Sequence, residues 1–181
     1  MGALELLWFA LIILFIFVGV VRGYPKELGT TTGIMVALLI LTEWGDRLMA
    51  GLDSLVSGVM GASLLIGPQA EIIQSLFFLG LFGAMVFLSY HGETLSFRGD
   101  PPRGPLGVAM NALSGAANGY LIAGTLWYYL DRFDYPIRFL GLFSPPLTNL
   151  AQALLPFLPV PILQPYLLLF IAFLIFVRVL R

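Results

Sequence analysis

The 181-residue chain has no cysteine, a single histidine and very little charge, and each shortage excludes a class of function. Without cysteine there can be no disulfide, thiolate metal site, thiol nucleophile or redox switch. His91 is the only histidine, and we expect neither a metal centre nor haem ligation. A net charge of −1 provides no basic field, so no nucleic-acid partner is expected.

Apolar residues are abundant instead, and they gather in long stretches. They make up 59% of the chain, while charged residues make up 10%, against roughly a quarter in soluble domains. Five stretches are long enough to cross a bilayer: about 4–21, 28–44, 72–90, 106–130 and 160–180. We therefore predict an all-α integral membrane protein, with one transmembrane domain over residues 1–181 and membrane lipid as its first partner.

Basic residues are shared unevenly between alternate loops of this five-span arrangement. Six lie on one side: Arg22, Lys26, Arg98, Arg103, Arg178 and Arg181. Three lie on the other: Arg47, Arg132 and Arg138. Because lysine and arginine accumulate in cytoplasmic loops, the split predicts an amino terminus outside and a carboxyl terminus in the cytoplasm.

Two further segments are predicted at the membrane surface. Residues 54–70 are uncharged but rich in glycine and serine, and counting them as a span would abolish the charge asymmetry. We therefore predict a re-entrant or interfacial helix there, packed against protein. A short amphipathic interfacial helix is predicted over residues 145–155, with Ser144 as its N-cap and Leu147, Leu150 and Leu154 on its apolar face.

The helix predicted over residues 106–130 is the most polar of the spans. Asn111, Ser114 and Asn118 recur at helical spacing and form one stripe, with Gly115 and Gly119 beside it. One interpretation is helix packing, in which glycine allows close approach and the amides bond across the contact. The other is a polar groove that admits a substrate, a quinone head group or a lipid head group.

Charged residues also mark the predicted outer end of the second span. Glu43 and Arg47 are four residues apart and share a helix face in the favourable order for an ion pair. We predict such a pair at the outer interface. A proton or ion relay is the alternative, and it requires Glu43 to be buried in the bilayer.

The joint between the first two spans reads Gly-Val-Val-Arg-Gly-Tyr-Pro-Lys-Glu from Gly19 to Glu27. Gly23 and Pro25 interrupt the first helix, which leaves Arg22 at the cytoplasmic interface. Glu27 then falls in the first turn of the second span, where the helix dipole favours an anion and the side chain can cap the helix. The turn either sets topology or docks a partner.

The pattern Gly-x-x-Arg-Gly-aromatic-x-basic-Glu after a first apolar helix resembles the bacterial colicin V production (CvpA) family. The small-residue-rich helix start at residues 29–37 and the glycine-rich stretch at 103–124 are similar as well, so the resemblance covers about residues 4–129. Pro25 and the threonine triplet at residues 30–32 depart from the family pattern. The resemblance implies a bacterial inner-membrane protein tied to export or envelope maintenance, with no agreed biochemical activity and no catalytic residues to transfer.

No residues at catalytic or metal-ligand spacing were found, so we expect a non-enzymatic protein without catalytic residues, metal or cofactor. Three classes are considered: an envelope or export scaffold, an accessory membrane subunit of a larger bioenergetic or transport complex, and a small transporter with a polar groove. Other membrane subunits or self-association are the expected protein partners. The residues expected to pack helices or bind a partner are Arg22, Gly23, Glu27, Asn111, Ser114, Gly115, Asn118 and Gly119.

Overall fold

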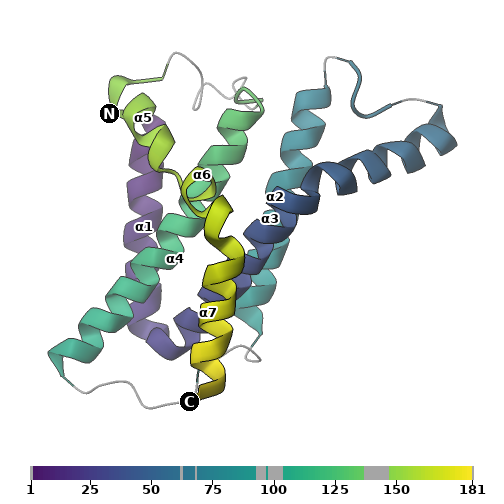
Figure 1. The fold of residues 1–181 in the computed structure, drawn as a ribbon. Helices are drawn as coiled ribbons and strands as arrows, with labels where there is room; N and C mark the ends of the chain where they lie inside the picture. Colours follow the sequence, from purple (N-terminus) through teal and green to yellow (C-terminus); the bar gives the residue numbers. More distant parts are fainter. Residues whose placement is uncertain are drawn as a thin grey trace.

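The computed structural model is a bundle of helices from which one helix extends outward (Figure 1). It describes residues 2–61, 63–67, 69–92, 97, 104–136 and 147–180. The all-α membrane fold predicted from the sequence is confirmed, because these residues form helices and no strand. Among them, four helical segments are long and apolar enough to cross a membrane.

Seven α-helices make up the described structure: α1 Ala3–Arg22, α2 Tyr24–Met60, α3 Ala70–His91, α4 Pro105–Arg132, α5 Asn149–Leu154, α6 Pro159–Leu163 and α7 Leu167–Leu180. The four apolar candidates are α1, α2, α3 and the run Asn149–Leu180. The amino terminus lies beside α5 at one end of the bundle, and the carboxyl terminus lies at the opposite end (Figure 1). Termini at opposite ends of the bundle fit a chain that crosses the membrane an odd number of times.

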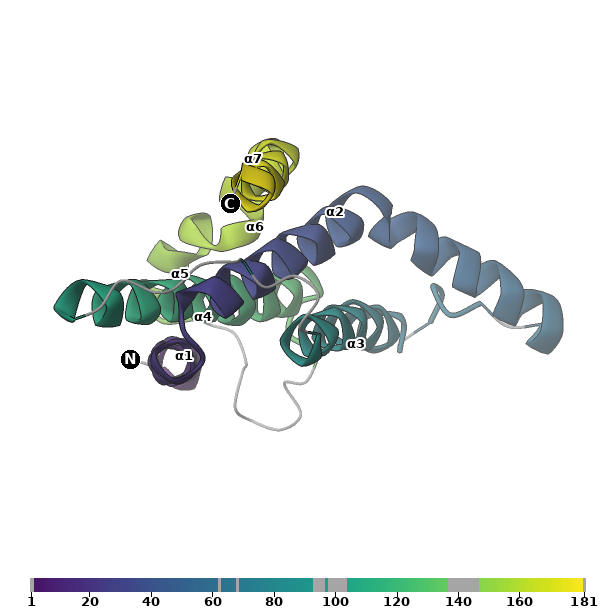
Figure 2. The ribbon, with the colours of Figure 1, turned by 90° about the horizontal axis from the view of Figure 1, so that it is seen from below.

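The helix α4 is not among the apolar candidates, yet it is the centre of the bundle. It packs along α1 and also contacts α2, α3 and α6, and α1 and α7 lie on opposite sides of it (Figure 2). Its 28 residues extend about 42 Å, which exceeds the roughly 30 Å hydrocarbon core. Because its neighbours cover it, α4 tolerates glycine and asparagine where a lipid-facing helix would not.

The helix α2 differs most from the prediction. It was expected to end near Trp44, with a separate helix over residues 54–70, and this division is wrong. α2 runs unbroken for 37 residues to Met60, Gly61 ends it in a left-handed conformation with φ +69°, and α3 begins at Ala70. No proline interrupts the helix, and its glycines cost about 1 kcal/mol each without breaking it. Residues 46–60, here called the arm, therefore extend α2 beyond the bundle (Figures 1 and 2).

The carboxyl-terminal run also departs from its predicted limits. The helix predicted over residues 145–155 begins at Asn149, because Thr148 caps it by accepting a hydrogen bond from the Ala151 amide at 3.1 Å. Its predicted N-cap, Ser144, lies outside the described residues. Of its predicted apolar face, Leu147 and Leu154 pack beside the buried Ala151, as expected, but Leu150 is exposed. The carboxyl-terminal helical run is interrupted by two 3₁₀ turns, at Leu155–Phe157 and Gln164–Tyr166, and each turn contains a proline.

Candidate functional site

The turn between α1 and α2 consists of a single residue. α1 ends at Arg22, Gly23 adopts φ +84°, and α2 begins at Tyr24. The Tyr24 amide donates to Asn111 Oδ1 on α4 at 2.8 Å. One of the unpaired amides at the start of α2 is thus satisfied by another helix. Glu27 was expected to cap this end, but its side chain makes no capping hydrogen bond.

Glu27 instead lies at the centre of a buried polar group that we call the Glu27 cluster: Arg22, Glu27, Thr31, Tyr90 and Asn118. The Glu27 side chain is 0% exposed, and its Oε1 lies 3.0 Å from Arg22 Nε. These two atoms are at ion-pair distance but lack the alignment of a hydrogen bond. The contact is therefore mainly an electrostatic attraction between a partly exposed guanidinium and a fully enclosed carboxylate.

The second oxygen of Glu27 is held by hydrogen bonds. Asn118 Nδ2 donates to Oε2 at 2.7 Å, and the Tyr90 hydroxyl donates to the same atom at 3.1 Å. Asn118 Nδ2 also donates to the Glu27 carbonyl at 3.0 Å, while its Oδ1 accepts from Thr31 Oγ1 at 2.7 Å. Both ends of the Asn118 amide are thus engaged, and α4 is tied to the first turns of α2.

Arg22 extends the Glu27 cluster to α3. Its Nη1 donates to the Tyr90 carbonyl at 3.1 Å, and its Nη2 reaches Thr30 Oγ1 at 3.5 Å. The guanidinium carbon stands 4.5 Å above the centre of the Tyr90 ring, a cation–π arrangement. A flat group with several donors is needed to make all these contacts at once, and arginine is the side chain that provides it.

The chemistry of the Glu27 cluster is that of a closed ion pair. Residues from α1, α2, α3 and α4 converge on one carboxylate, and its charge is balanced by Arg22. Removing two charges from water is costly, and the cost is offset only where geometry and additional hydrogen bonds are good. Removing one partner would leave the other charge buried without compensation, which is strongly destabilising.

Glycines bring α1 and α4 into direct backbone contact next to the Glu27 cluster. A Cβ added to Gly115 would stand 2.2 Å from the Phe15 carbonyl oxygen, and one added to Gly19 would stand 2.4 Å from the Asn111 carbonyl oxygen. At Gly119 the added atom would stand 2.9 Å from the Ile12 backbone. This side of α1 is therefore occupied by α4. No side chain fits at the contact.

The remaining predicted residue, Ser114, does not join the Glu27 cluster. Its hydroxyl donates to the Asn111 carbonyl of its own helix at 2.9 Å. Sequence reasoning missed Tyr90 and Thr31, which do belong to it. Thr31 lies one helical turn after Glu27, and Tyr90 ends a span at the same predicted membrane face as Arg22. These two positions in the sequence were the signals from which both residues could have been predicted.

A different ion pair forms past the middle of α2. Arg132 Nη2 contacts both oxygens of Asp46, at 2.8 and 2.9 Å, and its guanidinium also lies over the Phe78 ring. The predicted pair between Glu43 and Arg47 is wrong. Both side chains are exposed and no ion pair joins them, so each is solvated separately while the neighbouring Asp46 pairs with Arg132.

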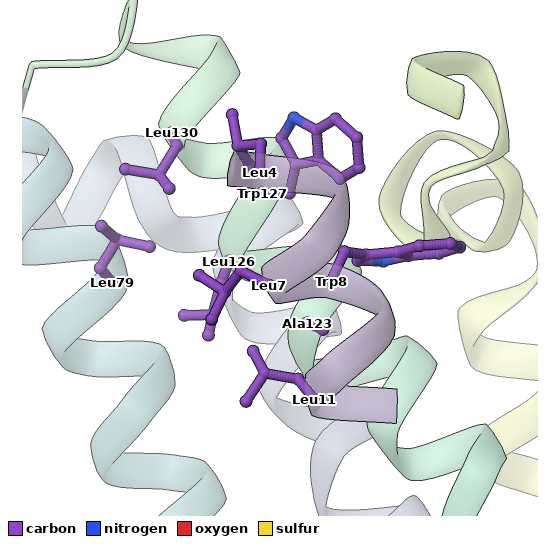
Figure 3. Close-up of a pocket in the computed structure, with 9 residues that line it drawn as sticks. All are labelled: Leu4, Leu7, Trp8, Leu11, Leu79, Ala123, Leu126, Trp127 and Leu130. Carbon is purple, nitrogen blue, oxygen red and sulfur yellow. The ribbon is translucent and has the colours of Figure 1, made fainter. Parts of the chain in front are cut away.

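Near the amino terminus the structure contains a buried carboxylate and an apolar cavity. Glu5 is buried and accepts a hydrogen bond from the Thr148 hydroxyl, which connects α1 to the start of α5. Beside it, a cavity of about 170 Å³ lies among nine apolar side chains of α1, α3 and α4, including Leu7, Leu79 and Leu126 (Figure 3). This cavity offers almost no polar atoms and differs in character from the polar stripe of α4.

In the described part of the chain, no three histidine or carboxylate side chains lie close enough together to bind one metal ion. His91 stacks on Phe87 at the end of α3, with ring centroids 5.0 Å apart. Other polar side chains, such as Glu5, are also buried. The Glu27 cluster is the candidate functional site because residues of four helices meet there at a buried carboxylate. Comparison of the chain with protein-family models, with curated proteins and with solved structures produced no match.

Proposed function

We propose that the protein is a non-enzymatic, multi-pass protein of the bacterial inner membrane that acts as a scaffold or accessory factor in envelope or export processes. The likeness of the Gly19–Glu27 turn to the colicin V production family motivates the process. The observation that carries the proposal is the closure of the Glu27 cluster. Arg22, Tyr90 and Asn118 all contact the Glu27 carboxylate from within the chain. A group enclosed in this way holds helices in position.

A rigid helix arrangement of this kind suits a protein that presents surfaces to others. The Glu27 cluster holds together the place where four helices meet, while the outer faces of α3 and α7 and one face of the arm stay uncovered by the described chain. Exposed leucine and phenylalanine side chains cover much of α7, as expected for contact with lipid or with another membrane protein. We therefore expect partners to bind these uncovered surfaces, whose relative positions the Glu27 cluster maintains.

The test is purification of the tagged full-length protein from its own membrane in mild detergent, with and without prior chemical cross-linking. The scaffold role predicts partners that are captured by cross-linking and are lost with Arg22→Lys, although the variant inserts normally. The control is Arg47→Lys, which changes an exposed arginine of the same type. Transport of a solute or of protons by the purified protein alone in vesicles would contradict the scaffold role.

An accessory subunit of a larger bioenergetic or transport complex is the alternative, and one observation favours it. Gly80 and Gly83 on α3 have no atom of the described chain within 4 Å of an added Cβ. Small residues on a span normally seat another helix, and here that helix would have to come from another subunit. Partners that co-purify in fixed stoichiometry without cross-linking would support this alternative.

The orientation across the membrane is part of the same proposal. The excess of basic residues in one set of loops supports an amino terminus outside and a carboxyl terminus in the cytoplasm. Because the chain has no cysteine, a single one can be introduced at Gly99, between α3 and α4. We expect Gly99→Cys to react with an impermeant thiol reagent only from the cytoplasmic side. Labelling in intact cells would contradict the orientation.

A further inference from the structure

The arm carries a continuous apolar stripe on one side. Leu48, Leu52, Leu55 and Val59 follow one another at intervals of four, three and four residues, so they lie within roughly 60° of one another around the helix. All four are exposed, Leu55 to 71% and Val59 to 86%. We call these four residues the apolar stripe. Nothing in the described chain covers it.

The opposite side of the arm is fixed by polar contacts. Asp46 pairs with Arg132 at the root of the arm, at 2.8 Å. Further along, Asp53 Oδ1 accepts hydrogen bonds from the Ser63 hydroxyl at 2.9 Å and from the Leu64 amide at 2.5 Å. The two aspartates lie on the side of the helix away from the apolar stripe. The polar contacts of the arm thus lie on the side opposite the apolar stripe.

These contacts determine which way the apolar stripe faces. The segment that returns from the arm to α3 runs along the side of the arm nearer the amino-terminal end of the bundle (Figure 1). Asp53 holds that segment, and the apolar stripe lies on the opposite side of the arm. The stripe therefore faces away from the amino-terminal end of the bundle, toward the part that α1, α3 and α7 span. The arm itself leaves the bundle across the direction of those helices (Figures 1 and 2).

We infer that the arm is an interfacial helix whose apolar stripe rests on the acyl chains of the bilayer leaflet at the amino-terminal end of the bundle. An amphipathic helix in that plane buries its apolar face just below the head groups and keeps its polar face outward. Helix–helix contacts in membranes rely on small residues, whereas the stripe consists of leucine and valine and suits lipid. This inference assumes that the bundle lies in a membrane, and it does not depend on the scaffold role.

The experiment uses the purified full-length protein in vesicles of phosphatidylethanolamine and phosphatidylglycerol, with no other protein present. A nitroxide label is attached at Leu55→Cys on the apolar stripe or at Ala50→Cys on the opposite side, and the chain offers no competing cysteine. Both sites are exposed, so neither label disturbs packing. Collision rates with oxygen and with a water-soluble nickel chelate are then measured by electron paramagnetic resonance.

We expect a several-fold higher oxygen-to-nickel ratio at residue 55 than at residue 50. Equal, high nickel access at both sites would overturn the inference, because the arm would then project into water. Protection of residue 55 from both reagents would also overturn it, since the apolar stripe would then be covered by a second copy of this chain. A scaffold that fails to capture partners leaves the label result unchanged, so the two proposals fail independently.

Discussion

The two halves of α2 have opposite surroundings although they form one continuous helix. In the first half, polar side chains such as Glu27 and Thr31 are buried, and Ile34 and Leu38 are buried beside them. In the arm, leucine and valine are exposed and the carboxylates of Asp46 and Asp53 bond back to the protein. Burial in this protein therefore follows the neighbours that the bundle supplies rather than the polarity of the residue. A membrane environment permits this, because lipid accepts exposed apolar side chains.

The sharpest test of the enclosed half is loss of the buried carboxylate. Glu27→Leu leaves Arg22, Tyr90 and Asn118 without their shared partner, and we expect a loss of about 4 kcal/mol in stability, as for other broken buried pairs. Glu43→Leu is the matched control, because that carboxylate is exposed on the same helix and should change stability little. Thermal unfolding in detergent, followed by circular dichroism, measures both. Equal melting temperatures would remove the distinction between the two halves.

The next largest effect is expected at the contact between α1 and α4. Gly115→Ala places a methyl group against the Phe15 carbonyl, and the helices must separate to admit it, at a cost of about 3 kcal/mol. Gly51→Ala adds the same group to the arm, where nothing lies within 4 Å, and should stabilise the helix by about 1 kcal/mol. Folded yield and melting temperature should therefore change in opposite directions. A fall in both variants would show that the arm is also enclosed.

Arg22→Lys should have an intermediate effect. Lysine keeps the positive charge but cannot reach Glu27, the Tyr90 carbonyl and Thr30 together, so we expect normal insertion and a loss of about 1.5 kcal/mol. Arg47→Lys serves as the control for an arginine in the arm. Melting temperature measures the first effect and accessibility of an introduced cysteine measures insertion. A silent Arg22→Lys would reduce the turn to a topology signal.

The smallest effect is expected at the root of the arm. Asp46→Asn weakens the pair with Arg132, but the Asp46 side chain is 73% exposed and such pairs contribute about 0.5 kcal/mol or less. Stability should scarcely change, and salt should mask the difference. Ser57→Asn provides a control away from any ion pair. A loss comparable to that of Glu27→Leu would mean that Asp46 anchors the arm far more strongly than its exposure indicates.

Much of this architecture could be predicted because it depends on local chemistry. Runs of apolar residues long enough to span a bilayer predict membrane helices whatever surrounds them, and Gly23 and Pro25 predict a break between α1 and α2. The predicted limits of α1, α3 and α4 differ from the structure by only one or two residues. The division of α2 at Trp44 failed, since a helix with no proline after its first turn continues as long as its backbone hydrogen bonds are satisfied.

Contacts between distant residues could not be derived in the same way. Arg22 and Glu27 lie close together in the sequence, but Tyr90 and Asn118 lie 63 and 91 residues away from Glu27, and no periodicity connects them. An ion pair was likewise predicted within α2, between Glu43 and Arg47, whereas the structure pairs the neighbouring Asp46 with Arg132 on α4. Composition and pattern thus establish that this is a helical membrane protein. The choice of polar partners, and the course of the arm outside the bundle, follow from how the helices pack, because those contacts depend on long-range proximity that a local pattern does not encode.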